Sequence, residues 1–416
     1  MGVSNQVQSG ARAPHAAGLA HGAPDAARAG LTQHKQRDRR DVTWVKPAVR
    51  RRTSLIQHKS ALRSFAYRSA TLVLLRNFMS LSPSLPELVC PAGSLPALKA
   101  AIDHGADAVY IGLKNETNAR NFPGLNFDEH GAREGIAYAH QRGRKVLMAI
   151  NTYAQGVDIT RWTRGVDQAA DLGVDAVILA DIGLMRYAAR RHPDLRLHMS
   201  VQSSATNYEA INLAHELFGV QRAVLPRVLT LDQVRHVIEH TPVQVEVFGF
   251  GSLCVMVEGR CLLSSYATGE SPNTHGVCSP AKHVRWEQGP QALDARLNGV
   301  LIDRYGAGEP AGYPTLCKGR FEVQDETYYA LEEPTSLNVI AMLPQILATG
   351  VAAIKVEGRQ RSPAYVAQVT QTLRAALDAA AHEGKRYNVK PAWQQTLGKV
   401  AEGAQQTLGA YNRPWR

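Results

Sequence analysis

The chain has 416 residues, of which 44% are apolar, enough to build one large domain or two ordinary ones with a proper core. Its formal charge of +11 would favour a nucleic acid or an anionic membrane as partner only if the folded part carried that charge. Of the 47 Lys and Arg residues, 14 fall in residues 1–78, and of the 36 Asp and Glu residues, 3 do, which leaves 33 of each sign for residues 79–416. The body of the chain is therefore neutral, and no nucleic-acid partner is expected for it.

Residues 1–84 are predicted to be a disordered basic extension. Residues 1–78 contain no Glu and carry basic runs such as Arg50 to Arg52, with little apolar periodicity. A transit peptide and a nucleic-acid-binding arm are alternatives, but we favour an upstream extension from a mis-called start, with the true start near Met79. The apolar run at residues 69–75 is too short to cross a bilayer, so no integral membrane segment is expected.

From Glu87 onward, short β-rich runs alternate with Ala- and Leu-rich stretches of helical spacing. The runs cover residues 87–93, 108–113, 145–151, 176–181, 197–202, 223–227, 244–251 and 353–358. Three of them follow a glycine, Gly105, Gly173 or Gly350, which suits a left-handed residue at the end of a helix. Nearly continuous apolar strands are typical of a parallel sheet that is covered on both faces.

Eight such units predict an α/β fold, a (β/α)8 TIM-barrel-like domain. An open doubly wound sheet is the alternative, but no G-x-G-x-x-G follows the first strand, as a dinucleotide site would require. The expected organisation is a barrel over residues 85–385 with a Cys-rich insert between strands 7 and 8, at about residues 251–335. A C-terminal tail over residues 386–416 is expected to pack on the barrel.

In such a barrel, the chemistry lies at the carboxyl ends of the strands. These ends supply a polar rim of mixed charge: Cys90, Asn118 to Asn121, Asn151, Asp181, Gln202, Arg227, the Cys254 segment, Glu357 and Arg359. For any one of them, a structural role in a hydrogen-bonded loop is the alternative. Arg359 with Glu357 is predicted either to hold an anionic donor such as a carboxylate, which fits the planar guanidinium fork, or to form a salt bridge at the rim.

Four of the five cysteines, Cys254, Cys261, Cys278 and Cys317, lie in one 64-residue window with the pattern C-x6-C-x16-C-x38-C. So few cysteines, and an odd number of them, are not typical of a disulfide-stapled secreted domain. Structural zinc sites usually pair their ligands as C-x2-4-C, a spacing that this sequence lacks. The wider spacing favours a [4Fe–4S] cluster, with zinc as the alternative. Cys90 is expected to pack as a small apolar residue, although a rim position leaves open a minor role as a reactive thiol.

The segments around these cysteines resemble the collagenase-like peptidase family. The resemblance rests on "EVFGFGSLCVMVEGRCLLSSY", "GESPNTHGVCSPAKHVRW" and "GYPTLCKGR", with "KVEGRQRSPAYV" further on, and it extends from about Glu87 to the C-terminus. Within the family, the chain is most similar to the branch that acts in oxygen-independent ubiquinone biosynthesis.

The resemblance implies a [4Fe–4S] cluster bound by Cys254, Cys261, Cys278 and Cys317, and a heterodimer with a UbiV-like subunit of the same family. It also implies that the pair hydroxylates the aromatic ring of a ubiquinone precursor in the absence of oxygen, with prephenate as the oxygen source. An accessory lipid-binding protein is expected to present the polyprenylated precursor, and the cytoplasm is the expected location. Either subunit of the pair is a candidate for the catalytic centre.

Two other activities of the family are alternatives. A metallopeptidase would need H-E-x-x-H, but His215-Glu216 is followed by Leu-Phe-Gly-Val, and neither G-x-S-x-G nor a papain-type cysteine context is present in the sequence. A hydroxylase of RNA bases would be favoured by a basic domain, because phosphate contacts dominate affinity for RNA. The neutral body of this chain speaks against that branch.

Overall fold

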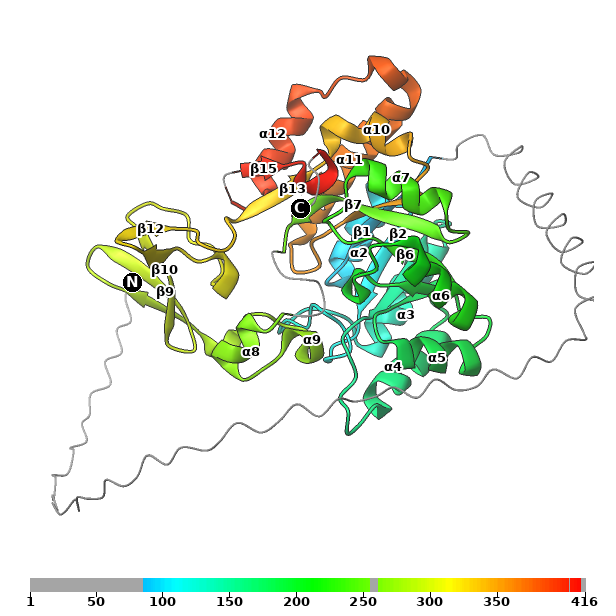
Figure 1. Ribbon diagram of the computed structural model, residues 1–416, viewed down its shortest axis with the longest axis horizontal. Helices are drawn as coiled ribbons and strands as arrows, with labels where there is room; N and C mark the ends of the chain where they lie inside the picture. The colour runs from blue at the N-terminus through cyan, green and yellow to red at the C-terminus, as the bar shows by residue number, and fades with distance from the viewer. Residues whose placement is uncertain (1–84, 255–260, 404, 413–416) are drawn as a thin grey trace, which may run out of the picture. The chain divides into compact units, whose positions relative to one another are not determined.

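The computed structural model describes residues 85–254, 261–403 and 405–412 (Figure 1). All described residues belong to one unit, Ser80–Arg416. The predicted extension over residues 1–84, and with it the predicted true start of the protein near Met79, lies outside the described residues.

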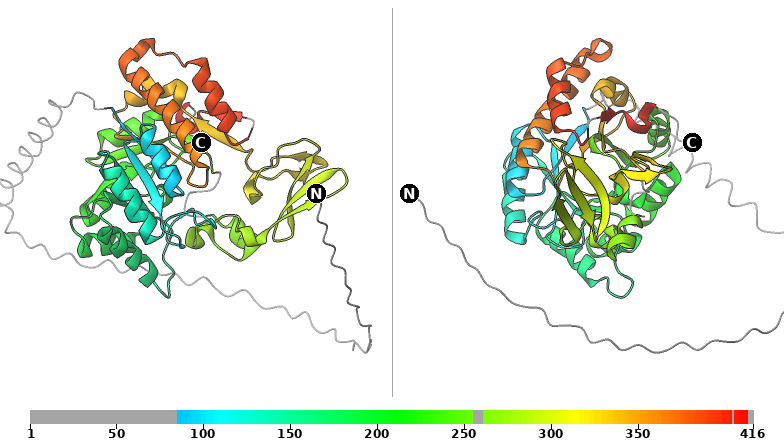
Figure 2. Two further views of the ribbon diagram at one scale, coloured as in Figure 1. Left: turned by 180° about the vertical axis from the view of Figure 1, so that it is seen from behind. Right: turned by 90° about the vertical axis from the view of Figure 1, so that its left-hand side faces the viewer.

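Eight parallel strands form a closed barrel (Figures 1 and 2). They are β1 (Glu87–Pro91), β2 (Ala108–Gly112), β3 (Lys145–Ile150), β4 (Ala176–Leu179), β5 (Leu197–Met199), β6 (Val220–Val224), β7 (Gln244–Ser252) and β14 (Ala353–Val356). Neighbours in the chain pair with one another, and β14 closes the ring by pairing with both β1 and β7. This closure confirms the predicted (β/α)8 fold and excludes the open doubly wound sheet.

Helices cover the outer face of the strands (Figure 2). They are α2 (Leu95–Asp103), α3 (Glu129–His140), α4 (Thr160–Asp171), α5 (Ile182–Arg191), α6 (Tyr208–Phe218), α7 (Leu231–Glu239), α10 (Leu343–Leu347) and α11 (Pro363–Glu383). The three glycines predicted to end helices have positive φ angles of 103° at Gly105, 72° at Gly173 and 81° at Gly350. That prediction is confirmed, since a side chain at these positions would be strained.

The buried side chains form an inner and an outer layer. The smaller hydrophobic cluster consists of strand residues only: Val89, Ala108, Tyr110, Leu147, Ala176, Ile178 and Ala353. It fills the barrel, together with buried charged side chains such as Glu246 and Lys355. The larger cluster joins the outer faces of the strands to the helices. Successive residues on a strand therefore alternate between the two layers, and residues two apart share a layer.

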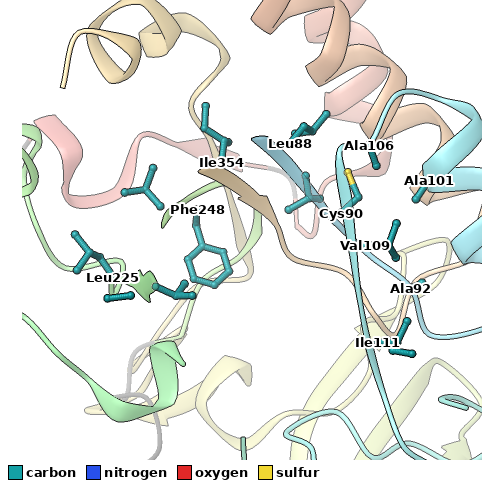
Figure 3. Close-up of a cluster of buried hydrophobic side chains, with 14 of the residues drawn as sticks. Leu88, Cys90, Ala92, Ala101, Ala106, Val109, Ile111, Leu225, Phe248 and Ile354 are labelled. Carbon is teal, nitrogen blue, oxygen red and sulfur yellow. The ribbon is translucent and has the colours of Figure 1, made fainter. Parts of the chain in front are cut away.

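Cys90 belongs to the outer layer, and its predicted place on the rim is wrong. Figure 3 shows Cys90 among Leu88, Ala106 and Val109. Its side chain is fully buried, and Thr370 Oγ1 donates a hydrogen bond to its Sγ at 3.2 Å. Burial raises the pKa of the Cys90 thiol to about 12 despite this hydrogen bond. A neutral thiol in an apolar layer packs as a small hydrophobic residue, as predicted.

The segment between β7 and β14 carries its own elements. They are α8 (Leu263–Thr268), α9 (Pro272–His275), β8 (Val284–Gln288), β9 (Ala292–Leu297), β10 (Val300–Gly306), β11 (Phe321–Val323), β12 (Glu326–Tyr328) and β13 (Thr335–Asn338). Strands β8 to β10 form an antiparallel sheet and β11 pairs with β12, whereas β13 returns to pair antiparallel with β7. After α12 (Pro391–Val400), β15 (Gln405–Thr407) pairs with β13 and so extends the barrel sheet.

Short 3-10 turns complete the described chain. They are η1 (Val201–Ser203), η2 (Ala281–His283), η3 (Leu316–Lys318), η4 (Ile340–Met342), η5 (Gly384–Arg386) and η6 (Gly409–Asn412). Among the helices of the described residues, none combines the length and apolar character that crossing a bilayer requires.

Candidate active site at the barrel mouth

A pocket opens at the carboxyl ends of the barrel strands. Its lining comes from seven strands and the loops that follow them: Tyr110, Ala119, Arg120, Ala149, Asn151, Ile178, Ser200, Val201, Gln202, Val224, Arg227, Phe248, Lys355, Glu357 and Arg359. Arg120, Asn151, Gln202, Arg227, Glu357 and Arg359 are rim residues that the sequence predicted. Tyr110, Ser200 and Lys355 were not predicted. Counting back by two from Glu357 to Lys355 along the strand would have found the lysine.

Glu357 forms an ion pair with Arg120, so the predicted alternative of a salt bridge between Glu357 and Arg359 is wrong. Arg120 Nε donates to Glu357 Oε1 at 3.4 Å, and Glu357 is buried. Burial alone would raise the pKa of Glu357, but Arg120, Arg227 and Arg361 hold it below its ordinary value. The pKa of Arg120 is shifted the other way: burial opposes its charge, yet Glu357 and the Cys278 thiol raise the pKa above the ordinary value. Both groups are therefore charged at neutral pH.

Arg359 is buried with unused hydrogen-bond donors. Its Nε and Nη1 have no hydrogen-bond partner, and the guanidinium lies 5.6 Å from the centre of the Tyr110 ring. Burial lowers the pKa of Arg359 to about 10, which still leaves it protonated at neutral pH. Each unsatisfied buried donor costs about 1–3 kcal/mol. A buried cation with free N–H groups that lines a pocket is suited to an anionic ligand oxygen.

Lys355 forms the floor of the pocket. Its Nζ donates to Glu246 Oε1 at 2.7 Å and lies 4.0 Å from the centre of the Tyr110 ring. Glu246 also accepts from Arg222 Nη1 at 3.4 Å, and Arg222 reaches Glu87 at 2.8 Å. Burial lowers the pKa of Lys355, which Glu246 partly offsets. Below Arg359, the ion pairs of Lys355 with Glu246 and of Arg222 with Glu246 and Glu87 therefore form a continuous network.

The remaining rim residues have structural partners. Asp181 is the N-cap of α5, where it accepts from the Gly183 amide at 2.7 Å, so the structural alternative holds for it. Asn151 bridges two loops: its Oδ1 accepts from Ala119 N at 3.0 Å and its Nδ2 donates to Ser200 Oγ at 3.1 Å.

The four clustered cysteines lie at the ends of the insert's short elements. Cys254 follows β7 and is exposed, Cys261 precedes α8, Cys278 follows α9 and Cys317 lies in η3. No disulfide joins any of the chain's five cysteines, all of which are described. Burial raises the pKa of Cys317 to about 12, with added repulsion from Cys254, and burial with the charge of Cys261 raises that of Cys278. Coulombic repulsion thus couples Cys317 to Cys254 and to Cys278, and Cys278 to Cys261. This holds although 38 residues separate Cys278 from Cys317.

The spacing of these thiols bears on what they can bind. In the described residues, no three of their sulfur atoms lie within 4.8 Å of one another. Four sulfurs around one zinc ion are about 3.8 Å apart, since tetrahedral Zn–S bonds are about 2.3 Å long. A [4Fe–4S] cluster is larger, because each thiolate binds a different iron. Four thiolates are the donor set that completes a [4Fe–4S] cluster.

Helix α9 connects the cysteine segment, by which we mean the described residues between Cys254 and Cys317, to the barrel mouth. The side chain of Asn273 bonds both backbone groups of Cys261: Oδ1 accepts from its amide at 3.2 Å, and Nδ2 donates to its carbonyl at 3.0 Å. The Asn273 carbonyl in turn accepts from Tyr153 N at 2.8 Å, in the loop after β3. At the end of α9, Gly276 has φ +79°, and an added Cβ would lie 2.1 Å from the carbonyl oxygen of Asn118. Only glycine permits this close approach.

Comparison with known proteins identifies the family. Residues 93–412 match the family model described as peptidase family U32. The chain is 30% identical over 319 residues to tRNA hydroxylation protein P of Escherichia coli (strain K12), covering 71% of this chain and 68% of that protein. It is 28% identical over 325 residues to the collagenase of Porphyromonas gingivalis (strain ATCC BAA-308 / W83), with coverages of 76% and 70%.

A third relative is larger. The 23S rRNA 5-hydroxycytidine C2501 synthase of Escherichia coli (strain K12) is 29% identical over 305 residues, which are 73% of this chain and 41% of that protein. The family match covers the barrel from β2 onward with helix α2, the insert with its four cysteines and the elements after α11, whereas β1 precedes it. The chain therefore belongs to peptidase family U32.

Proposed function

We propose that this chain is a UbiU-like iron–sulfur subunit that takes part in the oxygen-independent hydroxylation of the aromatic ring of a ubiquinone precursor. Two features together carry the proposal. The thiols of Cys254, Cys261, Cys278 and Cys317 interact electrostatically in pairs, and the adjoining pocket contains the unsatisfied buried guanidinium of Arg359. Two relatives are named for hydroxylation of RNA. Ring hydroxylation is chemistry of the same kind.

Cys254, Cys261, Cys278 and Cys317 would hold a [4Fe–4S] cluster, which supplies electron transfer or oxygen-atom transfer chemistry when bound. The chain's own residues bind and orient the reactants. Arg359 presents Nε and Nη1 to a carboxylate of the oxygen donor, for which prephenate is the candidate. The Arg120–Glu357 pair holds the loop between the pocket and Cys278 in place.

The proposed partners are a UbiV-like subunit in a heterodimer and an accessory lipid-binding protein that presents the polyprenylated precursor in the cytoplasm. Large apolar side chains are exposed in the cysteine segment: Tyr266 of α8 is 94% exposed and Leu262 is 70% exposed. Exposed aromatic and aliphatic side chains of this kind are favoured at protein interfaces. They support a protein partner that binds next to the cysteine segment.

Hydroxylation of an RNA base is the second candidate, because the names of two relatives point to it. The charge of the folded part speaks against it, since residues 79–416 hold 33 basic and 33 acidic side chains. Proteolysis is weaker still. If all four clustered thiols bind iron, and Cys90 is buried and neutral, no cysteine is left as a nucleophile.

The test is anaerobic co-expression with a UbiV-like partner, followed by metal and product analysis. We expect about four irons and four sulfides per chain and hydroxylated quinone precursors in the cells. Alanine at Cys254, Cys261, Cys278 or Cys317 should abolish both, whereas Cys90→Ala should retain the iron. Stoichiometric zinc in colourless protein would overturn the cluster. Hydroxylated tRNA or rRNA nucleosides, with unchanged quinone precursors, would establish the second candidate instead.

A further inference from the structure

We infer that His236, Glu239 and His240 form a binding site for a divalent transition metal ion such as Zn²⁺ or Ni²⁺. Each residue offers one ligand atom, and the three atoms all lie within 4.8 Å of one another. His236 and the C-cap His240 are four residues apart at the end of α7, so their rings lie on one face of the helix. Two imidazoles and one carboxylate are a donor set that suits these borderline ions.

The ring of His240 is already held in the tautomer that binds metal. Its Nδ1 is 2.8 Å from the carbonyl oxygen of His236, and because a carbonyl only accepts, Nδ1 carries the proton. The lone pair is then on Nε2, which is free to bind a metal. Histidines that bind metals almost always donate their other ring N–H to a carbonyl or carboxylate in this way.

Helix α6 holds the two rings in place. The ring of Tyr208 stacks on His240 with centroids 5.0 Å apart and an interplanar angle of 28°, and it meets His236 edge-on at 5.7 Å. Asn212 Nδ2 donates to the His240 carbonyl at 3.0 Å. The two histidine rings lie 4.1 Å apart. This support reduces the ordering that metal binding would otherwise require.

The ligand atoms themselves are not used elsewhere. In the part of the chain that the structure describes, the Glu239 carboxylate and the ring nitrogens of His236 have no hydrogen-bond or ion-pair partner, while neighbouring Arg235 is paired with Asp232. All three ligand residues are exposed, so an ion can reach them from solvent.

The site is separate from the barrel mouth. Helix α7 begins at its N-cap Thr230, after the carboxyl end of β6, and runs back towards the start of β7 at Gln244. Its last residues therefore lie at the opposite end of the barrel from the pocket and the cysteines. A metal bound here would bridge side chains of the last turn of α7, and so stabilise the native state without taking part in the reaction.

The test is a titration of the anaerobically purified full chain with Ni²⁺, followed by calorimetry. We expect the double variant His236→Gln/His240→Gln to lose one binding site relative to wild type, and Glu239→Gln to bind at that site about tenfold more weakly, or about 1.4 kcal/mol. His104→Gln is the matched control, since His104 Nδ1 makes the same bond to the carbonyl four residues back, that of Ala100, but His104 is not part of the cluster. Unchanged stoichiometry in the double variant would overturn the site.

Cobalt distinguishes this site from the cysteines. Co²⁺ bound by nitrogen and oxygen gives weak visible bands without the intense near-ultraviolet band of a cobalt–thiolate bond. We expect the histidine variants to lose the weak visible bands and to keep any near-ultraviolet band from a cobalt–thiolate bond. The melting temperature should rise with Ni²⁺ in the wild type and in His104→Gln but not in the double variant. An equal rise in all three would contradict the proposal.

Discussion

Arg359 and Arg222 are two buried arginines in one barrel with opposite surroundings. Arg222 is paired with Glu87 at 2.8 Å and with Glu246 at 3.4 Å, whereas Arg359 has two N–H nitrogens without acceptors. Removing one partner from a buried charge network costs about 3–5 kcal/mol, because the opposite charges are left uncompensated. Removing a buried charge that has no partner relieves a cost instead.

We therefore expect the substitutions Arg222→Met and Arg359→Met to have opposite effects on stability. Arg222→Met should lower the free energy of unfolding by about 3–5 kcal/mol. Arg359→Met should leave it unchanged or raise it, while abolishing ring hydroxylation, because the anionic ligand loses its fork. Urea unfolding of both variants, with assay of the co-expressed pair, checks this. A large loss of stability in Arg359→Met would show that Arg359 is a structural residue.

His198 predicts how stability depends on pH. It is buried in β5, and its pKa is lowered well below 6.5, first by burial and then by the charges of Arg222, Arg196, Lys355 and Lys145. Its ring is therefore neutral in the folded chain, whereas the unfolded chain binds a proton as the pH falls through about 6.5. The unfolded state then holds more protons, so the stability is present above pH 6.5 and is lost at lower pH.

The loss is about 1.4 kcal/mol per pH unit once the pH is below 6.5, or about 2 kcal/mol by pH 5. His198→Gln keeps an acceptor for Arg196 Nε, which lies 3.1 Å from His198 Nε2, and removes the titration. Its free energy of unfolding should therefore change less than that of the wild type between pH 7 and pH 5. Parallel curves for the two proteins would mean that other groups govern the acid sensitivity.

At the scale of elements, α9 is the link between the thiols and the barrel, and it acts through one side chain. Asn273 bonds both backbone groups of Cys261. We expect Asn273→Ala to keep the fold but to release iron to a chelator several-fold faster, because Cys261 loses two hydrogen bonds that hold its backbone. Asn207→Ala is the control: Asn207 caps α6 through Ala210 N at 3.0 Å and does not contact the cysteine segment. Equal iron release from both variants would count against a specific role of α9.

How far the sequence predicts an element depends on what its residues face. The run at residues 244–251 matches β7 closely because every residue from Val245 to Gly251 is buried. Strand β6 begins at Val220 rather than at residue 223, and the cause is Arg222, a buried charge that the apolar pattern cannot show. The β9–β10 hairpin was missed, although its Asn298-Gly299 turn, with φ angles of 48° and 83°, is a strong hairpin signal.

The site follows the same rule. Most of the polar pocket lining was predictable, because strand ends are visible in a sequence, whereas the four cysteines stay a prediction as cluster ligands. The pairing of Glu357 with Arg120 was not, since it joins residues that are 237 positions apart. The same holds for the Asn273 contacts, because α9 is one short turn within a long connection.

At the scale of the molecule, the core of the described residues and the excess of positive charge lie in different parts of the chain, and this separation distinguishes the two candidate substrates. The hydrophobic clusters lie within residues 88–411, in the unit Ser80–Arg416, whereas the excess of positive charge lies in residues 1–78. A chain that starts at Met79 should therefore keep the melting temperature and the iron content of the full chain. Its affinity for tRNA should be low and should depend little on salt, because few phosphates are neutralised.

The full chain should bind tRNA non-specifically at low salt and release it as salt rises. The reason is that residues 1–78 hold 14 basic but only 3 acidic side chains. Filter binding of both proteins between 50 and 200 mM salt, roughly the range over which such contacts weaken, measures this difference. If the chain from Met79 retained tight tRNA binding at the higher salt concentration, the folded unit itself would recognise RNA, and the hydroxylation of an RNA base would become the better proposal. Weak binding would leave the aromatic ring of a quinone precursor as the substrate that best suits a folded unit with balanced charge and the unsatisfied guanidinium of Arg359 at its barrel mouth.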